Sequence, residues 1–402
     1  MTLQSPFTTP SGSDVTPESH NALALLGMTA KKRSLRLASP PLVVAVAIVL
    51  TSVIYILGPK NFTGPDAAQY TAAALGHPSQ APFAYRVLVP AIVRALPFGT
   101  EHGFLVVTLA STLSTLLVIY ALLTTAGIGH AAALITMTVA GLSYPISYYL
   151  WNPNLVDPAA NLFLVLVPLF LLQGRYVHAV AAMIIATFVK ETSLVILPLL
   201  FFDATQHRIR LTVKGTACCL AVATCYATMR ATVHAAPGMF DVNSVADLRH
   251  LMAYVWTYNV GRYGVIPRVA HDVLHSFGFL WVAWFLGLFR MPRFLAVACT
   301  VPVCATLALC PLATDWARVL GMGFPAVVVS SGFFIHSELR DRSVAWVAAL
   351  IVVAACQVVL NMQVYQQIGL RGRVLYIAAT AAVFVAGLFV CLPRWRLQIR
   401  TS

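Results

Sequence analysis

The sequence has few charged residues. Only 10% of its 402 residues are Asp, Glu, Lys or Arg, whereas an ordinary soluble domain carries about 25%. Hydrophobic residues make up 59% of the chain. This composition excludes an ordinary soluble domain and indicates a polytopic membrane protein. We interpret the net charge of +13 as Lys and Arg flanking membrane spans on the cytoplasmic side rather than as a surface that binds nucleic acid.

The sequence also lacks a Cys/His cluster with the spacing of zinc ligands. Its eight cysteines all lie in apolar runs, where Cys packs as a small hydrophobe. We therefore expect no disulfide framework and no metal held by cysteine.

No small-residue cleavage site closes the first apolar run, 42–58, and a basic cluster precedes it. We expect this run to be an uncleaved anchor with the amino terminus inside. Residues 1–36 are rich in Ser, Thr and Pro and predict a disordered cytoplasmic tail.

The apolar runs predict an all-α fold for residues 37–402, a membrane domain with about twelve membrane segments. Two outer loops are expected, 58–103 with interfacial helices and 232–271. The predicted segments are 42–58, 104–126, 131–150, 159–173, 176–188, 190–203, 211–231, 272–289, 294–312, 318–336, 344–362 and 374–392.

Residues 176–203 can be one helix with Lys190 and Glu191 at its middle, or a hairpin with this pair at the outer turn. The hairpin places most downstream Arg and Lys clusters on the cytoplasmic side, as the positive-inside tendency requires. A bare Lys-Glu pair at the bilayer centre would cost several kcal/mol. The charge pattern therefore favours the hairpin, with both termini inside.

This topology collects ionisable residues from separate segments at the outer face, which is typical of a functional pocket in a membrane protein. Asp66 and Tyr70 lie one helical turn apart. Taken alone, Asp66 is favoured as a helix N-cap, and a role as general base does not exclude capping. Arg86 is either a phosphate ligand or an interfacial arginine that reaches the lipid headgroups. For Arg94 we expect the headgroup role.

Asp157 follows a short polar turn and is expected to cap the next helix, with a place in the pocket as the alternative. Lys190 at the hairpin tip is a candidate phosphate ligand. A mutual pair with Glu191 is disfavoured because adjacent helical residues point about 100° apart. Asp315 and Arg318 share one helix face, where they pair with each other or orient a substrate together.

Three features carry a resemblance: an acid in the first long outer loop (Asp66), expected interfacial helices in that loop, and the hairpin stretch KETSLVILPLL that begins at Lys190. Over roughly residues 42–235, and weakly at 315–318, the chain resembles the GT-C superfamily of polytopic membrane glycosyltransferases that use polyprenyl-phosphate sugars. It departs from the family pattern by having Glu191 after the Lys and a single acid near Asp66. These departures leave the donor and any need for a divalent metal open.

The resemblance implies an inverting transfer at the outer face of a bacterial inner membrane, without a cofactor. The sugar would move from a polyprenyl-phosphate donor to an envelope glycan, lipid or protein acceptor. Asp66 would be the general base, and basic residues would hold the phosphate that leaves with the lipid.

Two other functions suit the same pattern. Twelve segments with charged residues near one face and Pro-interrupted helices are also typical of a transporter or flippase for a lipid-linked or anionic substrate, although no clear repeat relates the two halves. The third reading is a structural subunit of an envelope-assembly complex.

Overall fold

The fold is helical, as predicted, apart from two-residue strands β1 (Phe202–Asp203) and β2 (Arg208–Ile209). The predicted tail and the predicted segments 344–362 and 374–392 lie outside the described residues. A computed structural model describes residues 39–60, 62–203, 208–209, 212–236, 245–261, 264, 272–273 and 275–341.

The α-helices follow the predicted apolar segments to within a few residues at most ends. In chain order they are α2 (Pro40–Leu57), α3 (Pro65–Ala74), α4 (Leu88–Ala95), α5 (Thr100–Thr125), α6 (His130–Gly141), α7 (Tyr144–Trp151), α8 (Asp157–Leu172), α9 (Tyr176–Val189), α10 (Val213–Thr232), α11 (Val245–Trp256), α13 (Phe279–Leu288), α14 (Arg293–Leu309), α15 (Trp316–Leu320) and α16 (Phe324–Asp341). Short 3₁₀ segments are η1 (Phe83–Tyr85), η2 (Glu191–Phe201), η4 (Cys310–Leu312) and η5 (Gly321–Gly323), and η3 (Thr257–Gly261) is a π-helix.

Among the described residues, four helical stretches are long and apolar enough to cross a membrane. They are α2, α5, α14 with η4, and Trp316–Arg340. The pair α6 and α7, bent by 47°, makes a fifth if it is one span. Shorter apolar helices, α8, α9, η2 and α13, lie among them. These helices support an integral membrane protein, and the total of twelve segments stays a prediction.

Glycine turns connect consecutive helices as close antiparallel neighbours. Gly127 after α5 and Gly174 after α8 have φ of +90° and +70°, the left-handed conformation that ends many helices. The amide of Arg175 reaches back to the Phe170 carbonyl at 2.8 Å, which satisfies the end of α8. The chain therefore reverses within a few residues into α6 and α9.

The stretch 176–203 is a hairpin, as the charge pattern predicted. Lys190 is extended (φ −160°, ψ 121°) and separates α9 from η2. The hydroxyl of Tyr176 at the start of α9 donates to the carbonyls of Leu200 and Phe202 at the end of η2, at 2.5 and 2.8 Å. Fourteen α-helical residues rise about 21 Å and eleven 3₁₀ residues about 22 Å, so the two arms match in length. Lys190 and Glu191 lie at the tip.

Small residues allow the long helices to pack closely, as membrane helices do. Helix α13 lies along α16, and α5 lies along α8. A Cβ added at Gly287 of α13 would stand 1.9 Å from the backbone oxygen of Ser330 in α16. The Ser330 hydroxyl donates to the Trp284 carbonyl at 2.6 Å, which ties the same two helices together.

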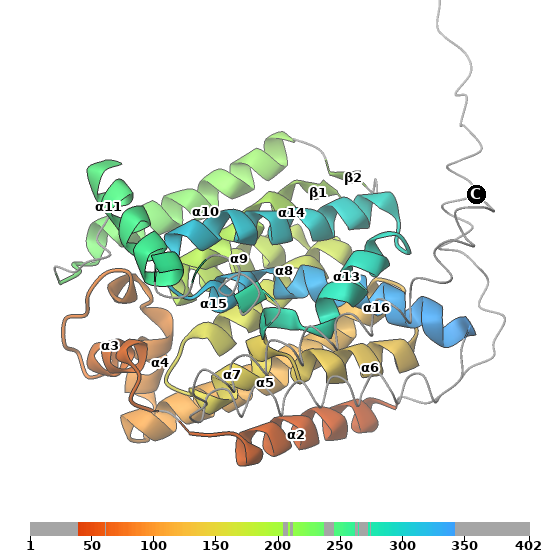
Figure 1. Cartoon of the computed structure of the whole chain (residues 1–402), viewed down its shortest axis with the longest axis horizontal. Helices are drawn as coiled ribbons and strands as arrows, with labels where there is room; N and C mark the ends of the chain where they lie inside the picture. Colours follow the sequence, from red (N-terminus) through yellow and green to blue (C-terminus); the bar gives the residue numbers. More distant parts are fainter. Residues whose placement is uncertain are drawn as a thin grey trace, which may run out of the picture. The chain divides into compact units, whose positions relative to one another are not determined.

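The two predicted outer loops meet at one end of the helices. The amide of Ala236 donates to the Ser79 carbonyl at 3.0 Å, and the Asn259 amide group donates to the Ala313 carbonyl at 3.0 Å. Figure 1 shows α3, α4 and α11 at this end, with β1 and β2 toward the other. The first loop contains helices α3 and α4, as predicted; their place at a membrane interface stays a prediction. We call this end the polar end.

Candidate functional site

Eight predicted site residues come together at the polar end. They are contributed by α3, the residue after η1, the first turn of α8, the tip of the α9–η2 hairpin, and the α15 region. We call the eight the polar network: Asp66, Tyr70, Arg86, Asp157, Lys190, Glu191, Asp315 and Arg318.

Asp157 is the centre of the network. One carboxylate oxygen accepts from the Lys190 ammonium, and the other accepts from Nη2 of Arg318 at 2.7 Å. The Asp157 side chain is 0% exposed and that of Lys190 is 5% exposed. Two cations from distant segments therefore share one fully buried carboxylate.

The turn before α8 holds Asp157 in place. The hydroxyl of Thr108 in α5 donates to the Pro153 carbonyl at 2.8 Å, and the side-chain amide of Asn154 donates to the Phe62 carbonyl at 3.3 Å. The Asn152 side chain bonds the Tyr148 carbonyl at 2.9 Å and so closes α7. These bonds connect the turn to α5, to the first outer loop and to α7, so the carboxylate has a fixed position.

Arg86 forms a second part of the network with Glu191. Its Nε and Nη2 donate to the two Glu191 oxygens at 2.8 and 2.5 Å, a bidentate geometry, and its Nη1 donates to the Tyr70 hydroxyl at 2.5 Å. Burial alone would lower the pKa of Arg86, but the Glu191 carboxylate beside it raises this pKa and the net shift is upward. Burial raises the pKa of Tyr70, so its phenol stays neutral. Arg86 is therefore charged where it pairs with Glu191.

Arg318 joins Asp66 to the buried centre. Its Nη1 donates to Asp66 while Nη2 and Nε face Asp157. The Asp66 side chain is 31% exposed, against 11% for Arg318. Asp315 accepts from the Arg318 backbone amide at 3.1 Å and so caps α15, the helix that carries this arginine. Asp66 is the carboxylate of these ion pairs that solvent reaches most easily.

Several sequence interpretations were wrong. The N-cap of α3 is Gly64 rather than Asp66, and Asp157, expected to cap α8, lies inside that helix with its carboxylate in the network. The guanidinium of Arg94 donates to the carbonyls of Ala74 and Ala73 at 2.9 and 2.5 Å, and its expected place at the lipid headgroups stays a prediction. Pro65 is the first residue of α3, and the Arg94 guanidinium donates to carbonyls at the C-terminal end of this helix.

The interpretations of the cations also change. Arg86 is buried rather than interfacial. As expected, Lys190 and Glu191 bond to Asp157 and Arg86 rather than to each other. Three carboxylates therefore face three cations in direct contact. A phosphate bound by Arg86 or Lys190 would have to compete with an ion pair already in place.

An aromatic group beside the network was missed by the sequence analysis. The ring of Tyr144 in α7 stacks on Tyr148 at 4.6 Å and meets His275 edge-on at 4.4 Å, and Tyr148 meets Tyr149 edge-on at 5.4 Å. These tyrosines share one buried cluster with Tyr70 of α3. The run YPISYYLW was the available signal, since three tyrosines and a tryptophan directly precede the turn that leads to Asp157.

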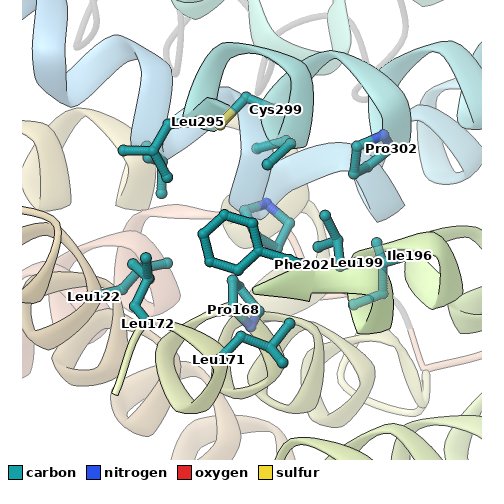
Figure 2. A pocket seen from close by; sticks show the side chains of 14 residues that line it. Leu122, Pro168, Leu171, Leu172, Ile196, Leu199, Phe202, Leu295, Cys299 and Pro302 are labelled. Carbon is teal, nitrogen blue, oxygen red and sulfur yellow. The ribbon is translucent and has the colours of Figure 1, made fainter. Parts of the chain in front are cut away.

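An apolar pocket lies deeper in the helices. On α8 it begins at Pro168, eleven residues after Asp157, or about 17 Å along the helix axis. Figure 2 shows apolar side chains converging on this space. Its lining is Leu122, Pro168, Leu171, Leu172, Ile196, Leu199, Phe202, Leu295, Ala298, Cys299, Pro302, Pro325, Ala326 and Val329. The lining of the pocket is apolar, as the site of a hydrocarbon chain would be, and the residues of the polar network are not among its lining residues.

Within the described ranges, no group of three His, Cys, Asp or Glu side chains is placed to hold a metal ion. Comparison with family models, with curated proteins and with solved structures finds no match to this chain.

Proposed function

We propose that the protein is an inverting glycosyltransferase that moves a sugar from a polyprenyl-phosphate donor to an envelope glycan, lipid or protein acceptor. The observation that carries this proposal is the polar network: one partly exposed carboxylate, Asp66, is held by the partly buried Arg318 at the edge of a cluster of ion pairs. Such costly groups in an apolar protein are typical of a functional site. We place the site on the periplasmic face of a bacterial inner membrane, in a domain of about twelve segments.

In the proposed reaction the acceptor hydroxyl gives its proton to the Asp66 carboxylate. Its oxygen attacks the anomeric carbon from the face opposite the phosphate. The bond between that carbon and the phosphate oxygen breaks, and the electron pair leaves with the polyprenyl phosphate. Asp66 is suited to this role because Arg318 orients it and solvent reaches it.

The charge balance of the network supports the same step. In its ion pairs three carboxylates, Asp66, Asp157 and Glu191, face three cations, and Asp315 adds a fourth carboxylate to the network. When Asp66 becomes protonated, the network gains one unit of positive charge at the moment when the leaving phosphate gains negative charge. The loss of a negative charge beside the developing anion stabilises the transition state. The apolar pocket would take part of the isoprenoid chain.

The test is turnover of purified protein on a panel of polyprenyl-phosphate sugars, with Asp66→Asn as the variant. Asn retains the shape of Asp but cannot accept the proton, a contribution worth about 10²–10⁴-fold in rate. We expect a folded protein that binds donor and has lost turnover by such a factor. Arg94→Gln is the matched control, because Arg94 closes α3 outside the network and its loss should not change chemistry per folded molecule. Normal turnover of Asp66→Asn would contradict the assignment.

The buried pair of Asp157 and Lys190 favours one alternative, a transporter or flippase for a lipid-linked or anionic substrate. Buried acid-base pairs in membrane proteins also serve proton relays and substrate pathways. An enzyme consumes lipid-linked sugar in detergent, whereas a transporter needs sealed vesicles to show its activity. Substrate movement across vesicles without consumption would select the transporter.

A further inference from the structure

The hydroxyl of Tyr149 is buried without a hydrogen-bond partner. The residue is 1% exposed, and no described group bonds its Oη. Leaving a buried hydroxyl unsatisfied is costly, so such a group in a native protein calls for an explanation. The explanation we pursue is that its partner is a bound ligand.

The position of Tyr149 directs this hydroxyl toward the polar network. A Cβ added at Gly321, directly after α15, would lie 3.7 Å from the Tyr149 oxygen. The phenol also lies within electrostatic reach of Asp157 and Arg318. Tyr149 therefore approaches from α7 the segment that carries Arg318.

Other unpartnered donors occur on the segments that form the network. The hydroxyls of Thr192 and Ser193 follow the hairpin tip, and the indole N–H of Trp316 is next to Asp315 in the chain. Ser193 is 0% exposed. Uncharged donors without partners thus come from the same three regions, α7, the hairpin tip and α15, that surround the paired charges.

We propose that Tyr149 is a substrate-binding residue whose hydroxyl donates a hydrogen bond to a ring hydroxyl of the transferred sugar. This inference rests on the proposed glycosyltransferase function. A neutral phenol fits a neutral hydroxyl oxygen, whereas the cations nearby are already matched by carboxylates. The ring of Tyr148, edge-on at 5.4 Å, adds an aromatic wall, and ligand sites combine such apolar walls with a few placed polar groups.

The test is Tyr149→Phe, measured for both stability and transfer. Removing an unpaired hydroxyl should leave the unfolding temperature of the ligand-free protein unchanged or raised. Removing a ligand contact should lower kcat/KM about tenfold. A series of monodeoxy donors then locates the contact: one of them should lower wild-type kcat/KM by the same factor and have no further effect on Tyr149→Phe.

Tyr176→Phe is the matched control. Its hydroxyl bonds two carbonyls at the other end of the hairpin, so this variant should lose stability while retaining kcat/KM per folded molecule. Unchanged kcat/KM of Tyr149→Phe with every donor would overturn the inference alone. A loss of stability of Tyr149→Phe equal to that of Tyr176→Phe would also overturn the inference, because it would mean that the Tyr149 hydroxyl bonds another group of the protein. Absence of turnover by the wild type on all polyprenyl-phosphate sugars would overturn the proposed function and this inference with it.

Discussion

Replacing Asp157 by asparagine should destabilise the protein far more than the same change at Asp66. Asp157 is fully buried between Lys190 and Arg318, so the variant leaves the buried Lys190 without its carboxylate and Arg318 with Asp66 alone. Breaking a buried ion pair by removing one partner costs about 3–5 kcal/mol. This corresponds to a loss of about 10²–10⁴ in the folding equilibrium constant.

Asp66→Asn is the internal comparison. Its side chain is 31% exposed and contacts one cation, so solvent screens the pair. We expect a cost of about 0–1 kcal/mol, as for exposed ion pairs. A second comparison is the double variant Asp157→Asn with Lys190→Met, which removes the buried cation that lost its carboxylate and should recover part of the lost stability.

The assay is denaturant unfolding in detergent micelles, followed by tryptophan fluorescence and checked for reversibility. The expected order of stability is wild type and Asp66→Asn, then the double variant, then Asp157→Asn. If Asp157→Asn lost less than about 1 kcal/mol, the buried carboxylate would not hold the network together. The same conclusion would follow if adding Lys190→Met lowered stability further.

Two more variants test packing and orientation. Gly287→Ala would place a Cβ 1.9 Å from the Ser330 backbone oxygen, so we expect loss of folded protein from the membrane fraction. Gly99→Ala is the control, because its added Cβ meets no atom within 4 Å and the variant should accumulate normally. Equal yields of the two variants would refute the close contact of α13 and α16. In a cysteine-free background, a cysteine in place of the exposed His77 at the polar end should react with an impermeant maleimide in intact cells. A cysteine in place of the exposed Arg175 at the opposite end should react only after lysis. The reverse labelling would refute the assignment of the polar end to the outer face.

The residues of the polar network could be predicted because charge is rare in this chain. In a protein with 10% charged residues, each acid or base near a predicted outer turn stands out by type alone. The same scarcity made the hairpin predictable, since a single helix would have carried Lys190 and Glu191 through the apolar centre. The tip now bonds Asp157 and Arg86, which is why its buried charges are tolerated.

The partners within the network could not be predicted. Asp157 and Arg318 are 161 residues apart, and Asp66 and Arg318 are 252 apart, so no local pattern connects them. Local patterns instead favoured capping for Asp157, because a carboxylate before an apolar helix is a common N-cap. The ion pairs of Asp157 with Lys190 and Arg318 outweigh the local preference for N-capping and hold its carboxylate in the network.

The sequence by itself determined that the chain is helical and apolar and where most helices begin and end. It also showed which ionisable side chains are costly to place in an apolar protein and are therefore candidates for a function. Composition and periodicity are properties of the chain alone. Apolar helices are removed from water because of their composition, whatever their neighbours in the fold. Only the tertiary structure decided that Asp157 is the buried centre, that Asp66 is the exposed edge, and that no described residue bonds the Tyr149 hydroxyl. These differences depend on burial and on contacts between distant segments, which exist only once the helices have packed.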